Sequence, residues 1–141
     1  MKGEAADLAA IRAVHDRYLA MDRKDLNEHV RELWSADPDC VYFNYSGRTL
    51  RGVEQWLEYE GAVLPKLRFI RRWEPFEEVI RVHGDRGWIT CSRIAEIEWL
   101  GEGESPIPTG PFLSRSTQIY HREPEGWRVV HAHFSPMCVD P

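Results

Sequence analysis

The 141-residue chain contains little cysteine and no long apolar run. Its three cysteines, Cys40, Cys91 and Cys138, are widely spaced and form no Cys-x-x-Cys motif, which argues against a disulfide framework and a zinc knuckle. No stretch of 18 apolar residues occurs, and the N-terminal residues include no apolar core of signal-peptide length. These absences predict a chain that neither crosses a membrane nor is exported, and they favour a reducing cytoplasm.

An excess of basic residues is also missing. The formal net charge is -5, so we expect no binding to the backbone of a nucleic acid, which depends on clustered lysines and arginines. Arg68, Arg71 and Arg72 do cluster, but acidic residues follow them from Glu74, a pattern typical of a solvated strand or turn. Lysine is scarce beside arginine, three against fifteen, a bias common in bacterial genomes rich in G and C.

Several catalytic signatures are absent as well. The sequence has no Gly-x-Ser-x-Gly motif and no Cys-His arrangement, and its glycines do not precede a helix in the pattern that cradles phosphate. The composition, 43% hydrophobic and 29% charged, is that of a globular protein, and the length fits a single domain over residues 1–141. No internal repeat or low-complexity tract interrupts the chain.

Helical spacing of apolar residues occurs three times in the first half of the sequence. The clearest stripe, over residues 4–22, consists of Leu8, Ile11, Val14, Tyr18 and Met21. A second, shorter helix is predicted over residues 25–34, and a third between Gly52 and Pro65. The β-branched and aromatic run 40–45 lies between these two and predicts a strand that ends at a Ser-Gly turn.

From Leu67 onward the apolar residues follow a period of two. Breaks at residues 83–85, 101–111 and 123–126 divide this part into four predicted strands. Helices followed by a run of antiparallel strands are typical of an α+β fold, in which the helices cover one face of a curved sheet.

The stretch RSTQIYHREPEGWRVVHAHFS, residues 115–135, carries a recognisable pattern. Its features are Thr117, Tyr120, His121-Arg122, Gly126-Trp127 and His131-x-His133-x-Ser135. The pattern resembles the last two strands of SnoaL-like and nuclear transport factor 2-like proteins, and closely those of the association domain of calcium/calmodulin-dependent protein kinase II. Upstream, DPDCVYFNYSGRTLRGVEQW is similar to the family sequence of an acidic turn, a strand, a Ser-Gly turn and a glycine that opens the third helix.

The resemblance implies a cone, with three N-terminal helices packed on a strongly curved, mixed, mostly antiparallel sheet that encloses a pocket. It also implies a homodimer formed through the outer face of the sheet. The same cone serves isomerases, cyclases, dehydratases, epoxide hydrolases and non-catalytic oligomerisation modules, so the fold alone names no reaction.

Arg93 interrupts an otherwise apolar strand face. That face consists of Ile89, Cys91, Arg93, Ala95, Ile97 and Trp99. Because a buried guanidinium is costly unless it is paired, Arg93 has either a structural carboxylate partner, such as Glu60 or Asp22, or an anionic or carbonyl-bearing ligand. The resemblance adds weight to the ligand, since the association domain carries an arginine at the matching position that points into its pocket.

The resemblance also assigns a lining to the pocket. The residues that it turns inward are Ser116, Gln118 and Tyr120 on one strand and Val130, Ala132 and Phe134 on the next. Gln118 and Phe134 stand where the association domain has pocket arginines, which favours a larger, mostly apolar ligand with one or two polar handles. On the opposite face, His121, His131 and His133 lie where they would hold either a metal or, as the resemblance favours, a dimer contact. We expect no metal and no other cofactor.

Tyr18, Tyr42 and Trp56 complete the predicted ligand-binding set. A phenol directed into a cavity can donate a hydrogen bond to a carbonyl or a developing enolate, as in ketosteroid isomerase, a relative by fold. The alternative is that each tyrosine is a core aromatic, and Trp56 is expected to pack over the cavity mouth. No carboxylate base can be assigned, because Asp22, one turn after Tyr18, has the surroundings of a solvated residue.

The sequence therefore predicts a small-molecule-binding cone, with isomerase, cyclase or dehydratase chemistry on a mostly apolar carbonyl-bearing ligand. The alternative is a non-catalytic oligomerisation or scaffold module like the kinase association domain.

Overall fold

The computed structural model describes residues 2–20 and 26–137. Asp22 and Cys138, both considered above, lie outside these residues, as does Met21 of the first apolar stripe. In chain order the elements are α1 (Lys2–Leu19), α2 (Leu26–Leu33), β1 (Val41–Phe43), β2 (Thr49–Arg51), α3 (Gly52–Val63), the short 3-10 helix η2 (Leu64–Lys66), β3 (Leu67–His83), β4 (Arg86–Trp99), β5 (Gly110–Glu123) and β6 (Gly126–Pro136).

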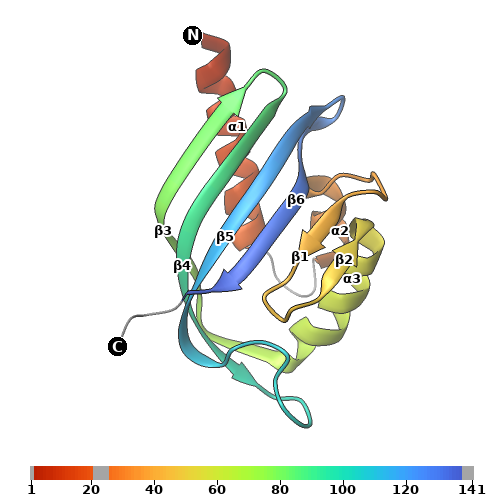
Figure 1. Ribbon diagram of the computed structural model, residues 1–141, viewed down its shortest axis with the longest axis vertical. Coiled ribbons are helices and arrows are strands. Elements are labelled where there is room, and N and C mark those ends of the chain that lie inside the picture. Colours follow the sequence, from red (N-terminus) through yellow and green to blue (C-terminus); the bar gives the residue numbers. More distant parts are fainter. Residues whose placement is uncertain (1, 21–25, 138–141) are drawn as a thin grey trace.

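The strands form a six-stranded sheet in the order β2-β1-β6-β5-β4-β3 (Figure 1). β1 runs parallel to β6, and every other neighbouring pair is antiparallel. The predicted α+β fold with a mixed, mostly antiparallel sheet is therefore confirmed. β2 was not predicted, because three residues with a single buried side chain, Leu50, give no measurable period.

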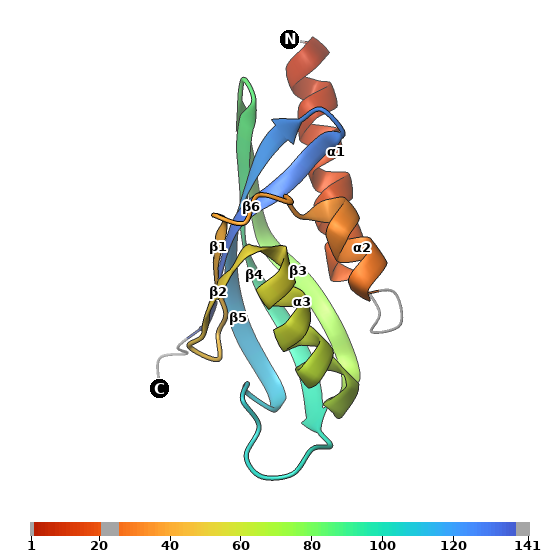
Figure 2. The ribbon, with the colours of Figure 1, turned by 90° about the vertical axis from the view of Figure 1, so that its right-hand side faces the viewer.

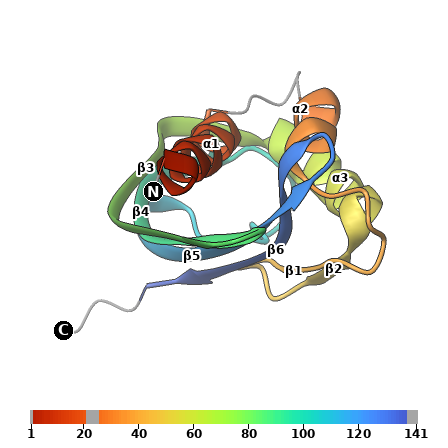
Figure 3. The same cartoon turned by 90° about the horizontal axis from the view of Figure 1, so that it is seen from above.

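All three helices lie on the same face of the sheet (Figure 2). Seen from above, the sheet bends around them, so that β3 curves over toward α1 while α2 and α3 close the opposite side (Figure 3). This is the predicted cone, and its concave side holds the core. No helix within residues 2–20 and 26–137 is long and apolar enough to span a bilayer.

The inner faces of β4 and β5 follow the predicted alternation. The buried residues are Ile89, Cys91, Arg93, Ala95 and Ile97 on β4, and Ser114, Ser116, Gln118 and Tyr120 on β5. On β6, Ala132 and Phe134 point inward as expected, but Val129 is fully buried where Val130 was expected to be. A register shift between Ile119 and Tyr120 causes the difference, since it makes Val130 an extra residue and reverses the alternation.

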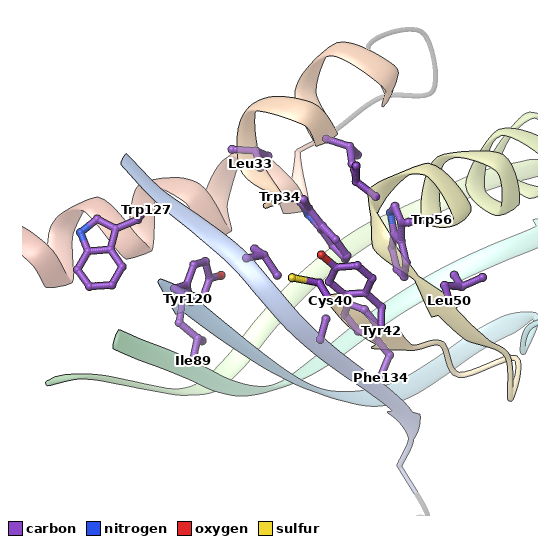
Figure 4. Packing of buried hydrophobic residues seen from close by; sticks show 14 of the residues in the cluster. Leu33, Trp34, Cys40, Tyr42, Leu50, Trp56, Ile89, Tyr120, Trp127 and Phe134 are labelled. Atoms are coloured by element: carbon purple, nitrogen blue, oxygen red, sulfur yellow. The ribbon is translucent and has the colours of Figure 1, made fainter. Parts of the chain in front are cut away.

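Aromatic rings form the centre of the core (Figure 4). The Trp34 ring centroid lies 4.3 Å from that of Tyr42 and 4.4 Å from that of Trp56, which ties the end of α2 to β1 and α3. Gly52 lets the chain turn from β2 into α3, because its φ is 72° and a Cβ there would lie 3.2 Å from Pro38 Cα. This conformation explains why a glycine opens the third helix.

Candidate functional site

A cavity of about 50 Å³ lies between α1, the β1–β2 turn, α3 and β3. Its wall is mostly aromatic and aliphatic, and its polar groups come from Tyr18, Asn44, Tyr45, Tyr59, Glu60 and Arg72. Ordinary ligand pockets enclose roughly 300–1,000 Å³, so this cavity accepts only a compact group. The sequence analysis expected a larger, mostly apolar ligand, and this cavity is too small to hold one.

Glu60 supplies the carboxylate that sequence reasoning left unassigned. It lies one helical turn after Trp56 on α3, so both side chains face the cavity. Burial raises the pKa of the Glu60 carboxyl to about 7, although the positive charge of Arg93 acts in the opposite direction. Near neutral pH this carboxyl therefore exists in both protonation states.

Three tyrosines, Tyr18, Tyr45 and Tyr59, share the cavity with Glu60. Burial raises the pKa of Tyr18 to about 12, against the effect of the Arg93 charge, and it raises the pKa of Tyr45 well above its ordinary value. The hydroxyls of Tyr18 and Tyr45 therefore stay protonated at neutral pH and are available as hydrogen-bond donors.

Arg93 lies directly behind the cavity wall and is 1% exposed. Its Nε donates a hydrogen bond to Ser114 Oγ at 3.3 Å, and its guanidinium carbon lies 4.2 Å from the ring centroid of Trp73 and 4.8 Å from that of Phe134. Arg93 forms no ion pair with Glu60 among the described residues, so Glu60 is not the structural partner considered above. The rings compensate part of the charge, and Nη1 and Nη2 have no well-aligned acceptor. Burial raises the pKa of Tyr18, but a hydrogen bond between Arg93 and the Tyr18 phenol acts together with the Arg93 charge to lower it.

Phe134 connects Arg93 to the cavity. Its ring centroid lies 6.0 Å from that of Tyr18, 5.9 Å from that of Trp56 and 6.1 Å from that of Tyr45. Four of the predicted ligand-binding residues, Tyr18, Trp56, Arg93 and Phe134, are thus brought together. Of these, Tyr18 and Trp56 line the cavity, while Arg93 and Phe134 form the layer behind it.

The other three predicted residues lie deeper in the core. Tyr42 is fully buried against Trp34 and Trp56, which matches the core-packing alternative, and burial raises the pKa of its phenol strongly. The Tyr120 hydroxyl donates a hydrogen bond to Gln118 Oε1, and both residues are fully buried. None of these three side chains lines the cavity.

Sequence reasoning considered Glu60 only as a partner of Arg93 and did not predict that Glu60, Tyr45 or Trp73 lines the cavity. For Glu60 a signal existed, because an acidic residue four positions after Trp56 falls on the buried stripe of the third helix. For Trp73 no such signal existed, since the register of β3 shifts between Phe69 and Arg71 and again between Arg71 and Glu74, the interval that contains Trp73, and the period is lost.

The histidines on the outer face of the sheet make local contacts. His131 Nδ1 lies 2.6 Å from the carbonyl oxygen of Val41, and the ring of Phe43 packs edge-on against His131 and His133 at 5.3 and 5.2 Å. Within the part of the chain that the structure describes, no three His, Cys, Asp or Glu side chains gather as a metal site would require.

Comparison with known proteins supports the fold directly. Residues 11–139 match the SnoaL-like domain family. No curated protein matches the chain. Among solved structures, a nuclear transport factor 2-like (NTF2-like) superfamily protein from Salmonella enterica serovar Typhimurium superposes with a TM-score of 0.81 at 21% identity, covering 97% of this chain and 95% of that one.

Two further structures share the fold at lower identity. A candidate dehydratase of the NTF2-like family from Streptomyces avermitilis gives a TM-score of 0.73 at 19% identity, covering 96% of this chain and 99% of that one. A candidate Ca/calmodulin-dependent kinase II association domain from Exiguobacterium sibiricum gives 0.69 at 14% identity and covers 94% of each chain. The resemblance drawn from the sequence is confirmed: the chain belongs to the SnoaL-like domain family and shares the fold of NTF2-like proteins.

Proposed function

We propose that this protein is a small-molecule enzyme that removes a proton from the carbon next to a carbonyl group. The observation that carries the proposal is the Glu60 carboxyl, with a pKa of about 7, in an apolar cavity that it shares with two protonated phenols. A general base works best when its pKa lies near the working pH, and few glutamates meet this condition.

In the proposed reaction, Glu60 accepts the proton while the electron pair of the broken C–H bond moves onto the carbonyl oxygen. Tyr18 donates a hydrogen bond to that oxygen, and the fixed charge of Arg93 behind the wall stabilises the enolate. Glu60 then returns the proton or passes it on. Placing it on another carbon gives isomerisation, attack of the enolate carbon on a second carbonyl gives cyclisation, and loss of a β-hydroxyl group as water gives dehydration.

Hydrogen exchange tests this step without knowledge of the natural substrate. We expect the protein to accelerate the exchange of α-protons for deuterium in a panel of small ketones in D2O, followed by proton NMR. Glu60→Gln should slow the exchange by about 10²–10⁴-fold, the usual contribution of a general base. Glu58→Gln, an exposed neighbour on the same helix, should leave the rate unchanged.

Exchange at the buffer rate across the panel would remove the proposal. An equal loss of exchange rate in Glu58→Gln and Glu60→Gln would also contradict it, because Glu58 does not line the cavity and the loss would then not depend on the cavity carboxyl.

A non-catalytic scaffold is the second candidate, and one observation fits it as well as it fits a dimeric enzyme. Phe43 is 39% exposed on the outer face of the sheet, between His131 and His133, where an apolar ring suits a contact between copies of the chain. Light scattering separates the two functions, since we expect a homodimer for the enzyme, whereas a closed ring of many subunits would favour the scaffold.

A further inference from the structure

We propose that the side chain of Ile107 sets the upper size limit of the ligand, so that the substrate is a small ketone with a short apolar substituent. This inference rests on the proposed function and adds the substrate class to it.

One side of the cavity is polar. Besides burial, the charge of Glu60 raises the pKa of both Tyr18 and Tyr45, so these three groups lie close together. A ketone bound for proton removal therefore places its carbonyl group and the adjacent carbon on this side.

The other side of the cavity is apolar. Ile107 packs with Ala95 and Ile97 in a hydrophobic cluster that is separate from the main core, and Tyr45 packs against both. Three further side chains pack against this second cluster and also line the cavity: Leu67, Phe69 and Trp73. The remaining carbon atoms of the ketone would therefore lie against Ile107 and these neighbours.

Ile107 reaches the cavity from a loop. Segment 100–109 connects β4 to β5, and it leaves the sheet where α3 runs into β3, with the Leu100 N–H donating a hydrogen bond to the Lys66 carbonyl oxygen at 2.8 Å (Figure 2). The structure describes the whole of this segment, and Ile107 is the one fully buried residue in it. The loop thus contributes a single apolar side chain to the cavity wall.

Local interactions hold the backbone at Ile107. Pro106 and Pro108 flank it, so both Ser105 and Ile107 precede a proline and favour an extended backbone. The Ile107 N–H donates a hydrogen bond to Ser105 Oγ at 3.2 Å, and the hydroxyl donates one to the Ile107 carbonyl oxygen at 2.7 Å. Because none of these interactions uses the Ile107 side chain, a shorter side chain should leave the loop in place.

The volume of the cavity sets the scale of the ligand. At roughly 10–15 Å³ for each water-sized group, a volume of about 50 Å³ holds about four non-hydrogen atoms. Acetone and butanone are of this size. Replacement of Ile107 by alanine removes carbon atoms from the apolar side of the wall and should make room for a longer substituent.

Chemical-shift titrations with the series of methyl ketones from acetone to 2-octanone test the inference. Each additional methylene that fits should strengthen binding about fourfold. In the unmodified protein we expect affinity to rise up to butanone or 2-pentanone and to fall for longer ketones.

Variants then locate the limit. In Ile107→Ala the ketone that binds best should be about one to three carbons longer than in the parent, because alanine lacks three of the isoleucine carbons. Ile107→Val is the milder change and should strengthen binding of the next longer ketone by at least about twofold. Ile89→Ala removes the same atoms from the main core, away from the cavity wall, and should not move the optimum.

Four results would overturn the inference: no binding by any ketone of the series, no decline of affinity with length in the parent, an unchanged optimum and unchanged affinities in both Ile107 variants, or an equal change in Ile89→Ala. If Ile107→Ala does not fold, Ile107→Val decides. The titrations need no turnover. An optimum that moves in the Ile107 variants without Glu60-dependent exchange would refute the proposed reaction and leave a size-selective binding site, whereas Glu60-dependent exchange with a fixed optimum would refute this inference alone.

Discussion

Replacement of Glu60 by glutamine should make the protein more stable at alkaline pH. A rise of the Glu60 pKa from 4.5, the usual value, to about 7 corresponds to about 3 kcal/mol of unfavourable free energy once the native carboxyl is ionised. Since water reaches part of this side chain, we expect about 2 kcal/mol.

The sign follows from the direction of the shift. Between pH 4.5 and about 7 the native state holds a proton on Glu60 that the unfolded state has released, so the stability of the unmodified protein falls as pH rises through this window. Glutamine removes this dependence. We compare the melting temperature of Glu60→Gln with that of the parent at each pH. This difference should be about 4–8 °C larger in favour of the variant above pH 7 than at pH 4.5.

Thermal and urea denaturation at several pH values from 4.5 to 9 measure this difference, with Glu58→Gln as the matched exposed control. A difference between Glu60→Gln and the parent that stays constant across this range would refute the reasoning. So would an equal pH dependence in Glu58→Gln.

Three further predictions concern the fold around the site. Phe134→Ala should lower the free energy of unfolding by about 3–5 kcal/mol in urea titrations, because it leaves a cavity beside Arg93; a loss below 1 kcal/mol would contradict the packing described. Gly52→Ala should cost about 1–2 kcal/mol in the same assay, because φ is 72° there, and an unchanged midpoint would argue against that turn. Phe43→Glu should convert a dimer to a monomer in light scattering with the melting behaviour of the fold retained, whereas an undisturbed dimer would place the contact elsewhere.

The order of the helices and of the long strands could be predicted because these elements are long enough to show their period. Residues 4–22 repeat every three to four positions, and the strands after Leu67 alternate. The failures have local causes. β2 is too short to show a period, and the extra residue in β6 moves Val129 inward in place of Val130.

The site was predictable only in part. Arg93 stood out because a lone cation on an apolar strand face needs an explanation, and the structure buries it. The effect of the Arg93 charge on Glu60 depends on how α3 packs across the sheet, which no local pattern encodes. Trp73 lies on an irregular strand, so only the three-dimensional arrangement places its ring against the guanidinium.

The most direct test of the account is the titration of the Glu60 side-chain carboxyl by carbon-13 NMR, in the native protein and in Arg93→Met. We expect a midpoint near 7 in the native protein and a higher one in the variant, because removal of the Arg93 charge leaves burial unopposed. A midpoint near 4.5 that does not move in the variant would show that the carboxylate and the guanidinium do not share one buried site.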